Sequence, residues 1–312
     1  MSKIHVGAWC AAMLFAASPV VAADQLTLMT GPQGGSWYPL GGAIKNLAEE
    51  NLGVGVQVVP GGGIANVKGV QTGRADIGFA NSVSTVEAIE GKGAFEGEAA
   101  DNVCNVATLY PQYFQVVVSA DGPATPADFD GLSLAAQARG NTGEAITAHL
   151  LEAYGMSYDD MRRVNYGSYT DSVALMKDGN ADIFTLGTTV PAGAIMDLAS
   201  ARDIRLVPID DDGLERMKAI NPGYQRIMIP AGSYPGQDAD VPTIGYSTHI
   251  VARCDLDADV VHGLLTQITD NVDTLGAIAK AAGSATPASM AVETGVPLHA
   301  GAERFYAEQG AM

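Results

Sequence analysis

The stretch that decides the fold is Thr30-Gly31-Pro32-Gln33-Gly34-Gly35-Ser36-Trp37-Tyr38-Pro39. It lies between a short apolar strand pattern, Gln25–Met29, and a helical pattern, Pro39–Asn51, whose Leu40, Ile44 and Leu47 share one face. The glycines let backbone N–H groups at the start of the helix approach a bound group closely, and such N–H groups suit carboxylate or phosphate oxygens. A tight turn that only packs against the core is the alternative, and the loop by itself leaves both open.

Outward from this loop, the chain repeats the same strand–loop–helix unit. We predict further strands at Gly55–Val59, Ala75–Ala80, Leu132–Ala136, Arg163–Asn165, Ala181–Leu186 and Ile204–Pro208. We predict further helices at Ile64–Thr72, Glu144–Tyr154 and Asp171–Asp178. Units of this length are typical of a largely parallel α/β sheet, in which binding groups gather at the carboxyl ends of the strands. Two successive blocks of such units predict two similar lobes that close on a small molecule.

The amino terminus has the pattern of an export signal. Lys3 precedes an apolar run, Val6–Ala17, and the small residues Val21-Ala22-Ala23 follow. The run is shorter than the roughly 20 apolar residues that a membrane span needs. We therefore predict a signal peptide over residues 1–23, cleaved after Ala23, and a periplasmic mature protein.

The chain is strongly acidic, with a formal net charge of −18. Cleavage would remove Lys3 and no acid, so the charge becomes −18 − 1 = −19. This charge excludes nucleic acid or an anionic membrane as partners bound through charge. An anionic ligand would need specific donors that overcome the overall field.

No motif for catalysis, a cofactor or a metal is found. The glycine loop lacks the ending of a P-loop, Ser36 is not in a G-x-S-x-G turn, and Asp210-Asp211-Asp212 lacks calcium-loop spacing and is interpreted as a solvated turn. We predict no metal, no cofactor and no enzymatic activity. In the predicted mature chain, Cys104 and Cys254 either pair or are separate buried thiols, and both readings stay open.

Polar residues at helix starts and strand ends are the candidates for ligand contact. Asn66, Asn81, Ser82 and Thr188 are neutral donors or acceptors, and each alone fits a helix cap as well as a ligand contact. Trp37 and Tyr38 either wall the ligand or cap the core beneath the loop. The histidines have no partner spacing. We interpret His149 and His262 as helix-surface residues and His299 as structural.

Arg139 is notable because positive charge is scarce in this chain. It lies in the loop Gln137–Gly143, just before a helix that Asn141 or Thr142 begins. A guanidinium beside free helix N–H groups can bind a carboxylate with two hydrogen bonds. A solvated loop arginine paired with a surface acid is the alternative.

Several segments together resemble the TAXI family, the extracytoplasmic receptors of one class of tripartite ATP-independent periplasmic (TRAP) transporters. They are the glycine loop with Ser36–Gly42, Gly61-Gly62-Gly63 with Asn66, Gly73–Phe79, Leu109-Tyr110-Pro111, Leu150–Gly155, Ile229–Gln237 and, near the end, Pro297-Leu298-His299 with Gly301–Tyr306. The resemblance extends over essentially all of the predicted mature chain.

The resemblance implies a two-lobed periplasmic-binding-protein type II fold with two hinge crossings, around Gln112–Val118 and Thr243–Ala252. Lobe I would contain residues 24–112 and 245–312, and lobe II residues 113–244. It also implies delivery of a bound small organic anion to membrane subunits run by an ion gradient. We expect the protein to be a monomer. A dicarboxylate or an acidic amino acid such as glutamate is the expected ligand. A ligand-sensing partner of a membrane sensor kinase, with the same fold and cleft, is the alternative.

The ligand loops of the family map onto five segments of this chain. Together with the candidates above, they predict contacts from Gly34, Ser36, Trp37, Tyr38, Gly63, Asn66, Asn81, Ser82, Arg139, Asn141, Thr142 and Thr188. The loop Gln137–Gly143 departs from the family pattern because it is longer and carries a charge. The identity of the ligand is therefore not carried over through that loop.

Overall fold

The computed structural model describes residues 25–31, 36–292 and 294–312. The predicted signal peptide and Gly34 lie outside the described residues. Within the described part, no helix combines the length and the apolar character needed to cross a membrane.

The described residues form an α/β structure with one long, mixed sheet. Its strands are β1 (Leu26–Met29), β2 (Val56–Val59), β3 (Ile77–Asn81), β4 (Cys104–Ser119), β5 (Ser133–Gln137), β6 (Arg163–Gly167), β7 (Ile183–Thr188), β8 (Ile204–Leu206), β9 (Gln225–Ile229) and β10 (Val241–Ala252). The strand order is β2-β1-β3-β10-β4-β7-β5-β6, while β8 pairs with β4 and β9 with β10.

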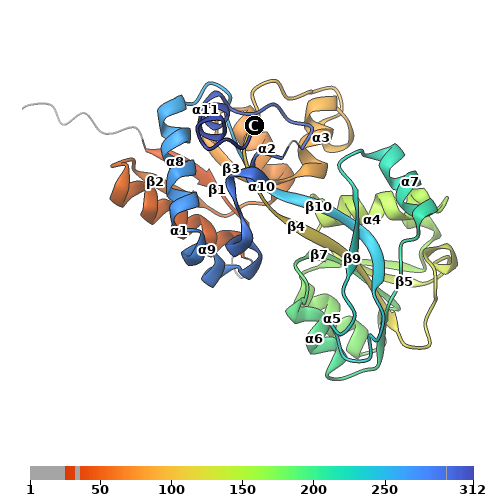
Figure 1. Ribbon diagram of the computed structural model, residues 1–312. Coiled ribbons are helices and arrows are strands. Elements are labelled where there is room, and N and C mark those ends of the chain that lie inside the picture. Colours follow the sequence, from red (N-terminus) through yellow and green to blue (C-terminus); the bar gives the residue numbers. More distant parts are fainter. Residues whose placement is uncertain (1–24, 32–35, 293) are drawn as a thin grey trace, which may run out of the picture.

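The two long strands β4 and β10 join the two halves of the molecule (Figure 1). β4 pairs with β10 up to Tyr113 and with β7 from Tyr113 onward. β10 pairs with β9 up to Gly245 and with β3 from Thr248 onward. We call the half with β1–β3 lobe I and the half with β5–β9 lobe II. The predicted α/β class with two lobes and two crossings is confirmed by this arrangement.

The prediction of a largely parallel sheet is wrong at its centre. The pairs β1–β2, β1–β3, β5–β6 and β5–β7 are parallel, as the strand–loop–helix units predict. The pairs β4–β10, β4–β7 and β3–β10, however, are antiparallel. The reason is that the chain leaves lobe I along β4 and returns along β10, so the two crossings run in opposite directions.

Helices cover both lobes. They are α1 (Trp37–Asn51), α2 (Gly63–Gln71), α3 (Ser82–Glu90), α4 (Thr142–Ala153), α5 (Tyr169–Lys177), α6 (Gly193–Ala199), α7 (Asp211–Ile220), α8 (Ala258–Asp270), α9 (Val272–Ile278), α10 (Pro287–Met290) and α11 (Ala300–Glu308). α1–α3 and α8–α11 lie on lobe I, and α4–α7 lie on lobe II (Figure 1).

One helix contradicts the sequence interpretation. The Asp210-Asp211-Asp212 segment is not a solvated turn but the start of α7. The side chain of Asp210 accepts a hydrogen bond from the backbone N–H of Gly213 at 2.7 Å, and the next acids lie in the first turn, where negative charge is favourable. Leu214 and Met217 then bury the inner face of the helix.

Each lobe has its own apolar core. In lobe I, α1, α8 and α11 pack on the sheet through residues such as Leu40, Leu265 and Phe305. In lobe II, α4 and α7 cover one face of the sheet, and α5 and α6 cover the other. Apart from Val83 of α3, which packs into the core of lobe II, each lobe can keep its own core if the lobes move relative to each other.

The two cysteines that the sequence left open are paired. Cys104 at the start of β4 and Cys254 just after β10 form a disulfide across neighbouring strands, with their Cα atoms 5.0 Å apart. The bond lies within lobe I and closes a loop of 150 residues that contains all of lobe II.

Candidate functional site

Three helices of lobe I begin at one edge of the sheet. α1 follows β1, α2 follows β2 and α3 follows β3, and because these strands are parallel, their carboxyl ends meet at the same edge. Within the described residues, no side chain caps the amino terminus of any of the three helices, and none of their first turns contains an acid. The free N–H groups and helix dipoles thus give this edge a local positive character.

The absence of acids in these turns is informative in a chain of net charge −18. Acidic residues are favourable in a first helical turn, and α4, α5, α7, α8, α9 and α11 all have at least one there. α1, α2 and α3 therefore present their amino termini without the negative side chains that occur at most of the other helix starts.

Two asparagines precede helices without capping them. Asn81 lies before α3 and Asn141 before α4, and neither side chain makes a capping hydrogen bond. Asn81 is 5% exposed, and its Oδ1 is buried without a hydrogen-bond partner among the described residues. Since asparagine is a preferred cap, these side chains are directed elsewhere. The capping interpretation of Asn81 is therefore not supported.

A polar row runs across three strands beside Asn81. Thr248 of β10 is in register with Asn81 of β3 on one side and with Tyr110 of β4 on the other. Gln112, two residues further along β4, donates a hydrogen bond to the Thr248 hydroxyl at 2.6 Å. Side chains in register on neighbouring strands share one face of a sheet. The row therefore forms a buried polar surface next to the three helix starts.

Tyr110 is the unusual member of this row. Its side chain is 3% exposed, and burial raises the pKa of its hydroxyl, an effect that nearby Ser36, Trp37 and Thr248 oppose. Within the described residues, the hydroxyl nevertheless makes no hydrogen bond of good geometry, and neither does the indole N–H of Trp37. Buried polar groups are usually paired, so these two atoms are candidates for ligand contact.

Trp37 combines both roles that the sequence suggested. Its ring stacks on Phe79 with centroids 5.5 Å apart, which makes it part of the lobe I core, while its N–H is left available. The adjacent Tyr38 is half-buried, and Ser36 is exposed.

Asn66 and Ser82 are engaged within the protein. The Asn66 side chain is fully buried, accepts from the N–H of Gly62 at 3.0 Å, and donates to the carbonyls of Thr30 and Phe79 at 2.9 and 2.8 Å. It thus joins the segments that follow β1 and β2 to strand β3. The Ser82 hydroxyl accepts from the N–H of Ser247 at 3.0 Å, beside the hinge.

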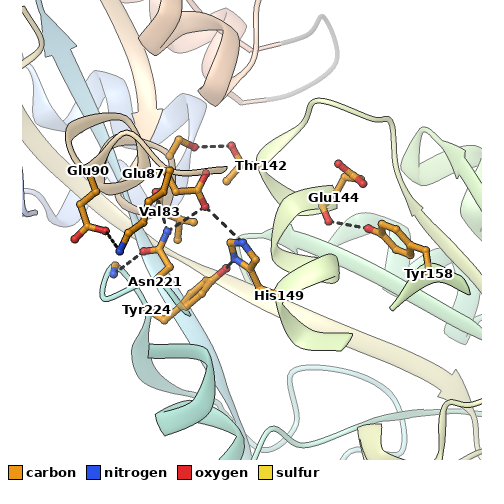
Figure 2. Close-up of polar contacts among 12 residues, drawn as sticks. Val83, Glu87, Glu90, Thr142, Glu144, His149, Tyr158, Asn221 and Tyr224 are labelled. Carbon is orange, nitrogen blue, oxygen red and sulfur yellow. Dashed lines mark hydrogen bonds and ion pairs between the residues drawn. The ribbon is translucent and has the colours of Figure 1, made fainter. Parts of the chain in front are cut away.

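Lobe II approaches this edge through α4. The hydroxyls of Ser84 and Thr142 lie 2.8 Å apart (Figure 2). A Cβ atom at Gly63 would lie 2.6 Å from Oγ1 of Thr142 and 3.1 Å from Nδ2 of Asn81, so only glycine fits there without a shift. Thr188 ends β7, in register with Tyr113 at the crossing.

Arg139 stacks on a tyrosine of its own lobe. Its guanidinium lies 4.4 Å from the ring centroid of Tyr166 and donates to the Tyr166 hydroxyl at 3.0 Å. Arg139 is exposed, and the contacts described for its side chain are with Tyr166 and not with an acid. Stacking holds the guanidinium plane fixed while leaving other N–H groups on its edge for a further partner.

Sequence reasoning missed part of the site and misjudged one histidine. The local sequence does not mark Tyr110, Thr248 and Gln112 as a set, because strand pairing brings them together. His149 is not a surface residue. Its side chain is 16% exposed, and its Nδ1 lies 2.7 Å from the hydroxyl of Tyr224.

The described residues contain no group of three or more His, Cys, Asp or Glu side chains that could hold a metal ion. What the arrangement can do is bind. It combines N–H groups at helix starts, a buried polar row with unpaired atoms, and a second lobe in contact across the edge.

Comparison with known proteins identifies the fold and the family of the chain. PhnD1 from Prochlorococcus marinus, solved in complex with methylphosphonate, is 14% identical and matches with a TM-score of 0.54, covering 93% of this chain and all of that one (100%). XAC2383 from Xanthomonas citri, solved bound to ATP, is 16% identical, with a TM-score of 0.51 and coverage of 92% and 96%. Both likenesses concern the fold, which is that of type II periplasmic binding proteins. Residues 28–310 match the NMT1-like family, and the chain belongs to that family.

Proposed function

We propose that this chain is a periplasmic solute-binding protein that captures a small organic anion between its lobes and delivers it to the membrane subunits of a TRAP transporter. The lobes would be divided as residues 24–112 with 245–312 and residues 113–244, after removal of a signal peptide. The observation that carries the proposal is the set of three uncapped, acid-free helix starts at one sheet edge. A strongly acidic protein gains such a local positive site only through specific structure.

The buried polar row narrows the ligand class. Helix N–H groups and the Trp37 N–H are donors, which match carboxylate oxygens. Asn81 Oδ1 is an acceptor, and the Tyr110 hydroxyl can accept or donate. An acidic amino acid supplies both carboxylates and an ammonium group, so it matches this set better than a plain dicarboxylate does. The TAXI resemblance, which includes Tyr110, implies an organic anion and does not distinguish between these two ligands.

Thermal unfolding of refolded, ligand-stripped protein with a panel of small organic acids and amino acids tests the proposal. A ligand at 100 times its dissociation constant adds about 2.7 kcal/mol of stability. We expect acidic amino acids to raise the unfolding temperature more than their amides or neutral analogues do. Equal effects from neutral analogues would contradict an anion site. Titration calorimetry of the best ligand then gives its affinity.

A further inference from the structure

A second polar cluster lies between the lobes, beginning in the first turn of α3 and extending along that helix. It is formed by α3 of lobe I and by α4 and the segment after α7 of lobe II (Figure 2). Val83 and Glu87 lie one turn apart on the same face of α3. Val83 is fully buried in the apolar cluster of lobe II, and Glu87 is only 5% exposed. This face of α3 is therefore an interface between the lobes.

Glu87 has polar partners only from lobe II among its described side-chain contacts. Asn221 donates through Nδ2 to Oε1 of Glu87 at 3.2 Å and to the carbonyl of Val83 at 3.1 Å, as Figure 2 shows. Nε2 of His149 lies 3.7 Å from the same carboxyl oxygen. On its other side, the His149 ring contacts the Tyr224 hydroxyl. The environment of this carboxyl group thus depends on the two lobes being together.

The surrounding charges do not compensate a buried carboxylate. In lobe I, the nearby charged residues are Glu90, which is a further acid, and Lys92, which forms an ion pair with Glu90 at 2.9 Å. Burial raises the pKa of Glu87 to about 7, the Asn221 hydrogen bond opposes this, and the charge of Glu90 adds to it. From lobe II, burial lowers the pKa of His149, and Glu152 opposes that shift. Burial also raises the pKa of Tyr224, so its hydroxyl stays neutral.

We propose that Glu87 is a proton-binding site that couples closure of the two lobes to uptake of a proton. In the closed arrangement, the side chain is a neutral carboxylic acid held against Asn221 and His149. Opening of the lobes exposes the carboxyl group to water, where the ionised form is favoured. The proposal concerns closure itself and holds for any ligand of the cleft.

The direction of the pH effect follows from the two states. If water restores the ordinary carboxyl pKa, 4.5, in the open state, closure takes up a proton between that value and about 7. Below this range both states are protonated, and above it both are ionised, with the closed state then containing a buried charge. Closure is therefore most favourable at low pH and weakens by up to about tenfold per pH unit through the range.

Small-angle scattering of ligand-stripped protein tests the coupling without a ligand. We expect the wild type to have a smaller radius of gyration at about pH 5.5 than at about pH 8.5. Glu87→Gln keeps the shape of the neutral acid and should have the small radius at both pH values. Glu90→Gln removes a charge that raises the pKa of Glu87, so this variant of the same helix should still change its radius with pH, with the midpoint at a lower pH than in the wild type. A wild-type radius that does not change with pH, or a Glu87→Gln radius that changes as the wild type does, overturns the proposal.

Carbon NMR of the side-chain carboxyl groups gives a second measurement on the wild-type protein. The Glu87 signal is the one absent from the Glu87→Gln spectrum. In protein saturated with the best ligand from the thermal screen, the Glu87 signal should titrate near pH 7. In ligand-stripped protein it should titrate at lower pH. Titration in the ordinary acidic range in both samples contradicts the proposal, whereas the failure of all ligands in the screen would instead contradict the proposed function.

Discussion

At the scale of single residues, substitution of buried polar groups can distinguish residues that bind the ligand from residues that stabilise the fold. A buried hydroxyl that makes no hydrogen bond costs free energy of folding, commonly about 1–3 kcal/mol. Within the described residues, the Tyr110 hydroxyl has no such partner, whereas the buried hydroxyl of Tyr306 donates to the carbonyl of Val106 at 2.8 Å. The two tyrosines therefore form a matched pair, in which one hydroxyl is available to a ligand and the other holds the core together.

We expect Tyr110→Phe to keep or slightly raise the stability of the empty protein, because it removes an unpaired polar group. It should weaken ligand binding by about tenfold, since a hydrogen bond to a charged group contributes about 1.5–3 kcal/mol. Tyr306→Phe should do the reverse, losing about 1–3 kcal/mol of stability at unchanged affinity. Denaturant unfolding and titration calorimetry measure both quantities. Loss of stability in Tyr110→Phe would show that its hydroxyl is paired within the protein.

Arg139 provides a second test at this scale. We propose that its guanidinium, fixed by stacking on Tyr166, binds one carboxylate of the ligand. Arg139→Ala should then weaken binding by more than about tenfold and hardly change the unfolding free energy. Arg139→Lys should not restore affinity, because an ammonium group lacks the planar fork. Arg304→Ala, which removes an equal charge from α11 and its ion pair with Asp259, is the control and should bind normally. Equal affinity for both alanine variants would leave Arg139 as a stacked surface residue.

At the scale of elements, the glycine that begins α2 determines how closely the lobes approach. Gly63→Ala places a methyl group 2.6 Å from Oγ1 of Thr142, across the interface between the lobes. We expect affinity to fall by at least about tenfold while the stability of the empty protein is kept, since alanine favours a helix by up to about 1 kcal/mol. Gly42→Ala in α1 meets no atom within 4 Å and should raise stability at unchanged affinity. Titration calorimetry measures the ligand affinity of both variants, and denaturant unfolding measures their stability. Normal ligand binding by Gly63→Ala would mean that the lobes do not close at this point.

The same scale shows what the sequence could predict. Local patterns were sufficient for α1, α2, β1, β2 and most of β5–β7, because hydrophobic spacing and flanking glycines are local signals. The antiparallel direction of β4 and β10 could not be predicted from them, because it depends on pairing between segments more than 100 residues apart, such as Thr248 with Tyr110. α7 was missed because Asp210, a helix cap, is also typical of a turn.

The candidate site was predictable to a similar degree. The strands that precede the candidate loops, β1, β2, β3 and β5, lie where the sequence predicts them, whereas contact of the loops with a ligand stays a prediction. The role of single residues within them was not predictable. Asn66 and Asn81 look alike in the sequence, yet the Asn66 side chain contacts four backbone groups, and the Asn81 oxygen has no partner among the described residues. That difference arises from packing in three dimensions.

At the scale of the whole molecule, closure requires that the two crossings bend while the lobes stay rigid. β4 changes partner at Tyr113 and β10 at Gly245, so these positions are where the two lobes join. The disulfide between Cys104 and Cys254 lies at the far ends of the same strands, inside lobe I. It fixes the strands to each other without joining one lobe to the other. The bond should therefore stabilise the fold and leave the movement free.

We expect a variant with both Cys104→Ala and Cys254→Ala to lose about 2–4 kcal/mol of unfolding free energy, the usual contribution of a native disulfide. Its ligand affinity should equal that of the wild type, and its radius of gyration should decrease by the same amount on ligand binding. Denaturant unfolding, titration calorimetry and small-angle scattering of the two proteins measure these quantities side by side. A variant that is stable but no longer contracts would place the hinge at the disulfide and not at Tyr113 and Gly245. Unchanged stability would mean that strand pairing alone, such as that of Cys104 with Ala252, already holds β4 and β10 together.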